Sequence, residues 1–147
     1  MRHQSLFSAA ILGAALLVGA TACGKKKITE CNQLIEVINK GVESLNKTPK
    51  GGGTDPTGAN ELKGMADAMD KVAAEAAKVE LTEPDLKKYS AEYQTMAKDV
   101  AKAARDMAAA AEAKDLAKIN SAQAALDKAV KQEDPLVDSI NKFCQAP

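Results

Sequence analysis

A regular apolar seam in the second half of the chain constrains the fold more than any other feature. Its members recur at alternating steps of three and four residues: Leu86, Tyr89, Tyr93, Met96, Val100, Ala103, Met107 and Ala110. Such steps place the side chains on one face of an α-helix, in the heptad pattern of helical bundles and coiled coils. The seam predicts a long helix over residues 83–113 that packs lengthwise against other helices.

The residues before this seam carry a helix-start signal. Thr82 is predicted to cap the backbone amide of Asp85 while the Asp85 side chain reaches back, as in a capping box. Leu81 and Leu86 stand at the two positions of a hydrophobic staple. Pro84 falls in the first turn, where its missing N–H is harmless. The helix is therefore predicted to begin directly after Thr82.

Helical periodicity recurs in three further segments. Apolar residues follow steps of three and four over residues 28–47, 59–80 and 116–144. Asp115 is the predicted N-cap of the last segment. Asp134-Pro135 interrupts that segment, either as a kink or as a fresh start with Asp134 as the cap. The last helix is thus predicted to be broken by a proline.

The connections between these helices are short. The longest, residues 48–57, contains three consecutive glycines and two prolines, and this composition predicts a flexible loop. Helices joined by short connections pack as antiparallel neighbours. The sequence therefore predicts an all-α fold: an up-down-up-down four-helix bundle over residues 28–147, with a Pro-broken last helix.

The core of such a bundle is small. Much of the 46% hydrophobic content is alanine, and the chain has only two tyrosines, two phenylalanines and no tryptophan. An alanine side chain buries little area, and apolar burial contributes only about 25 cal/mol per Å². A core of this kind needs a further constraint, such as a disulfide.

The N-terminal segment predicts export. Arg2 and His3 precede an apolar run from Leu6 to Ala20, and small residues follow that run. A charged start, an apolar centre and small residues before a cleavage site are the parts of a secretory signal peptide. The run is also shorter than the roughly 20 apolar residues of a membrane-spanning helix. Residues 1–22 are therefore predicted to be a signal peptide.

The end of this segment, Ala20-Thr21-Ala22-Cys23, resembles the lipobox of bacterial lipoproteins. The resemblance implies that cleavage leaves Cys23 as the new N-terminus and that its thiol carries a lipid. Gly24, with no Asp after the cysteine, resembles the pattern of lipoproteins sent to the outer membrane. Residues 23–27 would be a lipid-anchored linker whose three lysines are a solvated spacer or contact anionic headgroups. The same small residues also fit ordinary cleavage, which would release a soluble protein.

Cys31 and Cys144 are predicted to form a disulfide. With Cys23 acylated, they remain as an even pair in an oxidising compartment. In the predicted topology, the start of the first helix and the end of the last helix lie at the same end of the bundle. A metal site would need further ligands, and the only histidine, His3, leaves with the signal peptide. Neither a metal nor a cofactor is expected.

Charge and residue types exclude several classes of function. The 20 basic and 20 acidic side chains balance, so there is no electrostatic case for nucleic-acid binding. Without a histidine, the mature chain offers no Ser/His/Asp or Cys/His constellation, and haem lacks its usual ligand. An enzyme is therefore not expected.

Two sets of residues on the apolar faces of the predicted helices have alternative interpretations. Tyr89 and Tyr93 lie one turn apart, and we expect them to pack with their hydroxyls at the bundle edge rather than to stack on a ligand. Methionine fills gaps in apolar cores, but thioethers also suit Cu(I). The methionines concerned are Met65, Met69, Met96 and Met107. Core packing is the preferred interpretation for both sets.

The sequence predicts a non-catalytic, lipid-anchored cell-envelope protein that acts as a binding or structural module. Its expected partners are the membrane, through the lipid anchor, and an envelope protein. One alternative is a periplasmic bundle that binds a small ligand or Cu(I), and another is a self-associating coiled coil. The murein lipoprotein also combines a lipidated cysteine with Ala-rich heptads. This chain ends in Gln145-Ala146-Pro147 without a terminal lysine, so covalent attachment to the cell wall is not expected.

Overall fold

The described residues of the computed structural model, 22–47 and 55–146, are helical apart from turns. The helices are α1 (Ala22–Lys47), α2 (Ala59–Ala76), α3 (Pro84–Glu112), α4 (Leu116–Val130) and α5 (Glu133–Gln145). This confirms the all-α prediction. The predicted signal peptide and lipobox lie outside the residues whose side chains the structure describes, as does the Cys23 thiol.

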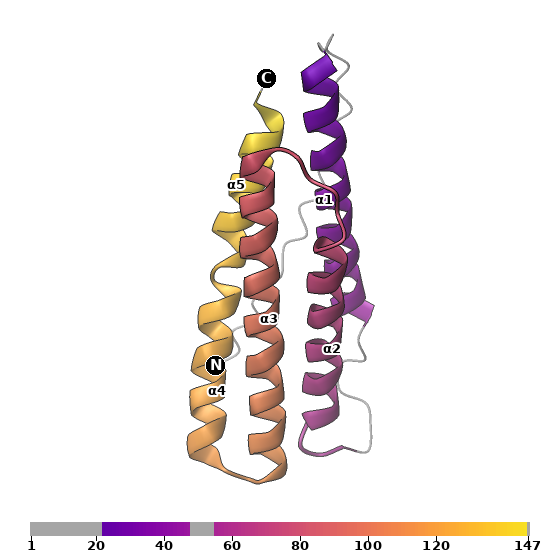
Figure 1. Cartoon of the computed structure of the whole chain (residues 1–147). Helices are drawn as coiled ribbons and strands as arrows, with labels where there is room; N and C mark the ends of the chain where they lie inside the picture. Colours follow the sequence, from indigo (N-terminus) through magenta and orange to yellow (C-terminus); the bar gives the residue numbers. More distant parts are fainter. Residues whose placement is uncertain (1–21, 48–54, 147) are drawn as a thin grey trace.

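The helices lie side by side along one long axis (Figure 1). The longest, α3, lies between its neighbours, with α2 packed against it on one side and α4 and α5 on the other. α1 packs mainly against α2 and makes smaller contacts with α3 and α5. The molecule is therefore a helical bundle in which α1 is the least embedded of the long helices.

Helix α1 is longer at its N-terminus than the apolar pattern predicted. It begins at Ala22 rather than at Ile28, so residues 23–27, predicted as a linker, are helical. Lysine has a good helix propensity, and Lys25, Lys26 and Lys27 continue the helix without a break. The segment next to the predicted lipid attachment is thus an extension of the bundle's own helix.

The predicted capping box at the start of α3 is wrong. The N-cap residue is Glu83, and no side chain caps the helix locally. The Thr82 hydroxyl instead donates to the carboxylate of Glu30 on α1. Pro84 does stand at the first helical position, as predicted. A carboxylate distant in sequence has replaced the local partner.

The last helix is interrupted, as predicted, but the break precedes Asp134-Pro135. The N-cap residue of α5 is Gln132, and Asp134 lies in the first turn without capping it. Pro135 has no N–H to donate to the carbonyl of Lys131, and its ring excludes that carbonyl from a regular helix. The proline therefore breaks the helix one turn before itself, and the prediction of Asp134 as a cap is wrong.

The predicted seam of α3 forms the centre of the core. All of its members are buried except Tyr89, which is half-buried. Small residues let neighbouring helices approach closely. At the contact of α1 with α2, a Cβ atom added to Gly41 would lie only 2.6 Å from Cγ2 of Val72. Close packing of small side chains compensates in part for the scarcity of large ones.

Candidate functional site

The N-terminal half of α1, the C-terminal half of α5 and the connection between α2 and α3 meet at one end of the bundle (Figure 1). We call this region the stapled end. The predicted disulfide between Cys31 and Cys144 is present there, with the two Cα atoms 5.8 Å apart and 113 positions apart in sequence. Cys31 is buried, and Cys144 packs at the edge of the core. The disulfide joins the first helix to the last.

A lysine of α1 also binds the end of α5. Nζ of Lys27 donates to the carbonyl oxygen of Ala146 at 2.8 Å and lies 4.6 Å from the centroid of the Phe143 ring. The ring of Tyr89 meets Phe143 edge to face, with centroids 6.1 Å apart. Cation–π contacts of this kind contribute about 0.5–1 kcal/mol at exposed sites. Lys27 therefore reaches from α1 to the C-terminal end of α5 and is engaged there.

The third contact of the stapled end is made by Glu30, whose side chain is buried with 4% of its surface exposed. Its carboxylate accepts hydrogen bonds from the backbone N–H of Thr82 at 2.8 Å and of Glu83 at 3.0 Å, and from the Thr82 hydroxyl. Burial raises the pKa of this carboxyl, but the bonds from Thr82 and Glu83 outweigh burial and leave the pKa below its ordinary value. Glu30 thus fastens α1 to the start of α3 as a carboxylate.

Sequence reasoning did not single out Glu30. The available signal was its spacing, because Glu30 lies four residues before Leu34, which is fully buried, and one residue before Cys31. An acidic residue on the buried face of a helix needs polar partners. The pattern alone could have marked the residue, but not its partners, which lie 52 and 53 positions away.

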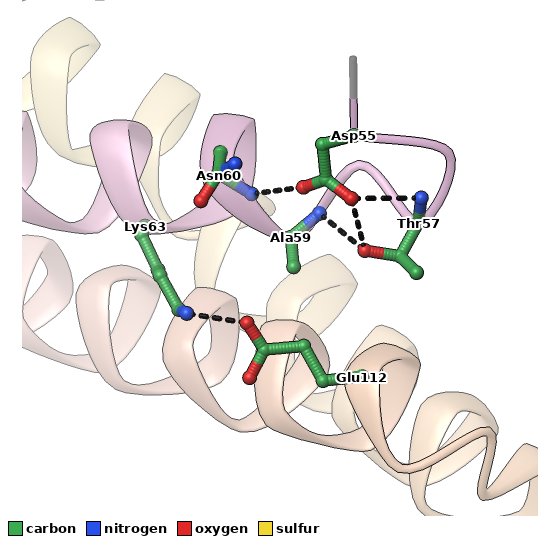
Figure 2. Close-up of polar contacts among 6 residues, drawn as sticks. All are labelled: Asp55, Thr57, Ala59, Asn60, Lys63 and Glu112. Atoms are coloured by element: carbon green, nitrogen blue, oxygen red, sulfur yellow. Dashed lines mark hydrogen bonds and ion pairs between the residues drawn. The ribbon is translucent and has the colours of Figure 1, made fainter. Parts of the chain in front are cut away.

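The opposite end of the bundle is closed by local interactions (Figure 2). The Asp55 carboxylate accepts from the backbone N–H of Thr57 and of Asn60, both at 2.9 Å, and from the Thr57 hydroxyl. The Thr57 hydroxyl accepts in turn from the N–H of Ala59 at 3.3 Å. The hydrogen bonds to the Asp55 carboxylate lower its pKa to about 2, and the bond from the Thr57 hydroxyl makes the largest contribution. We call this region, residues 55–60 together with the turn between α3 and α4, the capped tip.

The last part of the loop predicted over residues 48–57 is a hydrogen-bonded turn. Asp55 to Gly58 form a hydrogen-bonded turn that precedes α2, and Gly58 adopts a φ of 70° that favours glycine. Residues 48–54 lie outside the described part of the chain. The glycines and prolines dominated the composition, whereas Asp55 and Thr57 supply the side chains that organise the turn.

The capped tip also contains the predicted cap of α4. Asp115 accepts a hydrogen bond from the backbone N–H of Lys118 at 3.1 Å, which confirms it as N-cap. The preceding Lys114 has a φ of 55°. The first residue of α4, Leu116, keeps 75% of its surface exposed.

Exposed ion pairs connect α2 with α3 between the two ends. Lys63 pairs with Glu112 at 2.5 Å (Figure 2). Arg105 pairs with both Asp67 and Asp70, at 2.9 and 2.7 Å. Pairs exposed to this degree contribute little to stability because solvent screens them. They favour a particular alignment of the two helices without being a candidate site for chemistry.

The methionine and tyrosine side chains on the apolar helix faces pack as expected. Met69, Met96 and Met107 are buried, and Met65 packs half-buried against the core. Tyr93 keeps only 2% of its surface exposed, and burial, followed by the nearby negative charge of Glu133, raises the pKa of its hydroxyl. The packing interpretation is confirmed for these residues. Binding of Cu(I) stays a prediction.

The hollows of the described surface include two shallow ones, one beside α3 and one between α1 and α2. The larger has a volume of about 310 Å³ and is lined by Lys88, Ala91, Glu92, Thr95 and Gln132. The smaller, of about 180 Å³, is lined by Lys40, Gly41, Ser44, Ala68, Lys71, Val72 and Glu75. The residues that line the larger hollow are all exposed, whereas the smaller hollow is lined in part by the buried Gly41 and Val72. Neither brings together the candidate residues of the sequence analysis.

In residues 22–47 and 55–146, no three or more His, Cys, Asp or Glu side chains are grouped closely enough to hold a metal ion. Over the same ranges, no helix combines the length and apolar character needed to cross a bilayer.

Comparison with known proteins found no matching family model, and no curated protein or solved structure with significant similarity. The stapled end is therefore the candidate functional region. Its three contacts all involve residues 27–31 of α1, and they bind that helix to α5 and to the start of α3.

Proposed function

We propose that the chain is a non-catalytic, lipid-anchored protein of the bacterial cell envelope, attached to the outer membrane through Cys23, and that it acts as a binding or structural module. The observation that carries the proposal is the disulfide between Cys31 and Cys144. Disulfides persist in oxidising compartments outside the cytoplasm. A signal peptide over residues 1–22 with a lipobox-like end would deliver the chain to such a compartment.

The position of the staple supports the same proposal. Cys23 and Cys31 belong to one continuous helix, α1. A rise of about 1.5 Å per residue places their backbones roughly 12 Å apart along the helix axis. A lipid on Cys23 would therefore hold the bundle by its stapled end, with the capped tip directed away from the membrane and accessible to an envelope partner.

We further infer the up-down-up-down order of the helices. Its support is the packing of α3 against both α2 and α4, the neighbours to which short connections join it. The disulfide between α1 and α5 agrees with a last helix that returns to the end where the first began. In this order α4 and α5 together make the fourth, broken helix.

The engagement of polar groups at the stapled end favours a structural role over catalysis. Glu30 is saturated by hydrogen bonds from Thr82 and Glu83. The Lys27 ammonium is held by Ala146 and Phe143. A general acid or base must be able to reach a substrate proton, and these groups are occupied by the fold itself.

Metabolic labelling with palmitate in cells tests the proposal. The full-length chain and a Cys31→Ser/Cys144→Ser variant are both expected to incorporate the label, because both retain Cys23. A Cys23→Ser variant is expected to incorporate none. Equal labelling of the Cys23→Ser variant, or no labelling of the unmodified chain, would contradict the lipid anchor.

A further inference from the structure

The first two turns of α1 expose an apolar side chain among lysines. Ile28 keeps 47% of its surface exposed, and the only other exposed large hydrophobic side chain among the described residues is Leu116. Lys25 lies three positions before Ile28, so the two share one face of the helix. Lys26 is also exposed, at the flank of that face. We call Lys25, Lys26 and Ile28 the basic apolar patch.

The neighbouring charged groups leave Lys25 and Lys26 exposed. Lys27 does not belong to the patch, because its ammonium is directed to Ala146 and Phe143 at the end of α5. The nearest acidic residue in sequence, Glu30, attracts Lys26, but its carboxylate is buried and hydrogen-bonded to Thr82 and Glu83. The patch therefore presents two cationic side chains and one apolar side chain to the surroundings, a combination typical of surfaces that lie on anionic lipid.

The patch lies close to the proposed lipid attachment and is rigidly connected to it. Ile28 follows Cys23 by five residues within α1, so their backbones are roughly 7–8 Å apart along the helix axis. The headgroup region on each side of the hydrocarbon core is about 5–8 Å thick. Three residues beyond Ile28, the disulfide fixes α1 to the bundle. The lipid is thus joined to the domain by a helix and not by a flexible tether.

We infer that the basic apolar patch seats the bundle on an anionic phospholipid surface and holds it there in one orientation. The inference rests on the proposed function, because the acylated Cys23 supplies the attachment. Lys25 and Lys26 are attracted by the negative surface potential, and Ile28 enters the boundary between headgroups and acyl chains. The stapled end then faces the bilayer, and the capped tip projects from it.

Tryptophan fluorescence in vesicles tests this inference. The chain contains no tryptophan, so Ile28→Trp introduces a single reporter within the patch. Leu116→Trp is the matched control, because it replaces the other exposed large hydrophobic residue, at the opposite end of the bundle. Both variants, expressed from the full-length sequence and purified from the cells that process them, would be mixed with vesicles of phosphatidylglycerol and phosphatidylcholine with brominated acyl chains, which quench tryptophan on contact.

The expected result is strong quenching and a blue-shifted emission for Ile28→Trp, with no quenching for Leu116→Trp. Adding Lys25→Gln and Lys26→Gln to Ile28→Trp should reduce the quenching severalfold on anionic vesicles. Adding Lys114→Gln and Lys118→Gln, the same change of charge at the capped tip, should leave it unchanged.

Vesicle flotation separates the two ways in which the experiment can fail. If the variants float with the vesicles but Ile28→Trp is quenched no more than Leu116→Trp, the seating inference is overturned and the lipid anchor stands. If neither variant floats, the anchor is absent, and the proposed function falls together with the inference. Flotation with selective quenching of Ile28→Trp supports both.

Discussion

The stapled end and the capped tip close the same bundle by opposite means. At the stapled end, residues 113 and 52 positions apart are joined by the disulfide and by Glu30. At the capped tip, Asp55 bonds to residues two and five positions away, and Asp115 bonds to a residue three positions away. Local caps stabilise the ends of individual helices, whereas long-range contacts hold one helix to another. The comparison indicates that α1 depends on the stapled end for its place in the bundle.

The largest expected effect follows from removal of the staple. Cys31→Ser/Cys144→Ser frees a loop of 113 residues, and the chain-entropy model gives a loss of roughly 4–5 kcal/mol for a loop near 100 residues. Urea unfolding with and without reductant measures the loss. Hydrogen exchange should locate its main effect in α1, because α3 keeps its contacts with α2 and α4. If the unfolding midpoint of the unmodified protein were the same with and without reductant, the role of the staple would be contradicted.

Removal of the second long-range contact should have the next largest effect. Glu30→Ala leaves the N–H groups of Thr82 and Glu83 without their acceptor, and the lost charge-assisted hydrogen bonds contribute about 2 kcal/mol. The matched control is Glu36→Ala on the same helix, whose side chain is 63% exposed. Thermal unfolding should separate the two variants clearly. Equal melting temperatures would mean that the Glu30 contact does not hold α1.

The contribution of Glu30 should depend on pH in a defined direction. Because the pKa of Glu30 in the folded protein lies below its ordinary value of 4.5, folding favours the carboxylate. The stability from this effect is complete above pH 4.5 and is lost as the pH falls through the lowered pKa. The difference in unfolding free energy between the unmodified protein and Glu30→Gln should therefore shrink on acidification below pH 4.5. A difference that stays constant would contradict the hydrogen-bonded carboxylate.

A change at the contact of α1 with α2, away from both ends, should have a smaller effect on stability. Gly41→Ala places a Cβ atom 2.6 Å from Val72 Cγ2, and the stiff valine side chain cannot rotate away easily. Overpacking costs about 1–3 kcal/mol, and the better helix propensity of alanine offsets about 1 kcal/mol of this. Urea unfolding should show a net decrease in the free energy of unfolding. Gly41→Ala should be better tolerated in a Val72→Ala background, where the clash is removed.

The smallest effect is expected at the capped tip. Asp55→Ala removes the acceptor for the N–H groups of Thr57 and Asn60, so the first turn of α2 should exchange its amide hydrogens faster. The melting temperature should fall less than in Glu30→Ala, because no second helix is held by Asp55. Asp67→Ala, an exposed residue of α2, serves as control and should leave that turn protected. A larger loss for Asp55→Ala than for Glu30→Ala would reverse the comparison.

The sequence predicted what depends on spacing along the chain. The seam from Leu86 to Ala110 identified the core face of α3, and Asp115 was recognised as a cap. Pro135 indicated the broken last helix, and the parity of cysteines indicated the pairing of Cys31 with Cys144. Each of these follows from a local rule, or from a rule of composition, that needs no knowledge of neighbours in space.

The errors arose at the starts of helices α2, α3 and α5. The Thr82 capping box was chemically reasonable. The buried Glu30 carboxylate instead accepts hydrogen bonds from the Thr82 hydroxyl and from the Thr82 backbone N–H, just before α3. The break before α5 was misplaced because Pro135 acts on the carbonyl of Lys131, one turn earlier. At Asp55, the glycine-rich composition concealed a carboxylate that accepts a hydrogen bond from an N–H of the first turn of α2. The packing of α1 determines the first of these outcomes, and sequence periodicity does not contain it.

The lipid anchor and the staple can be tested together by measuring the intact mass of the protein from its native membrane, with and without reductant. We expect a chain that begins at Cys23, carries the mass of its lipid chains, and gains two hydrogens on reduction as the disulfide between Cys31 and Cys144 opens. A mass without lipid would contradict the anchor. A mass unchanged by reductant would contradict the staple on which the comparison of the two ends depends.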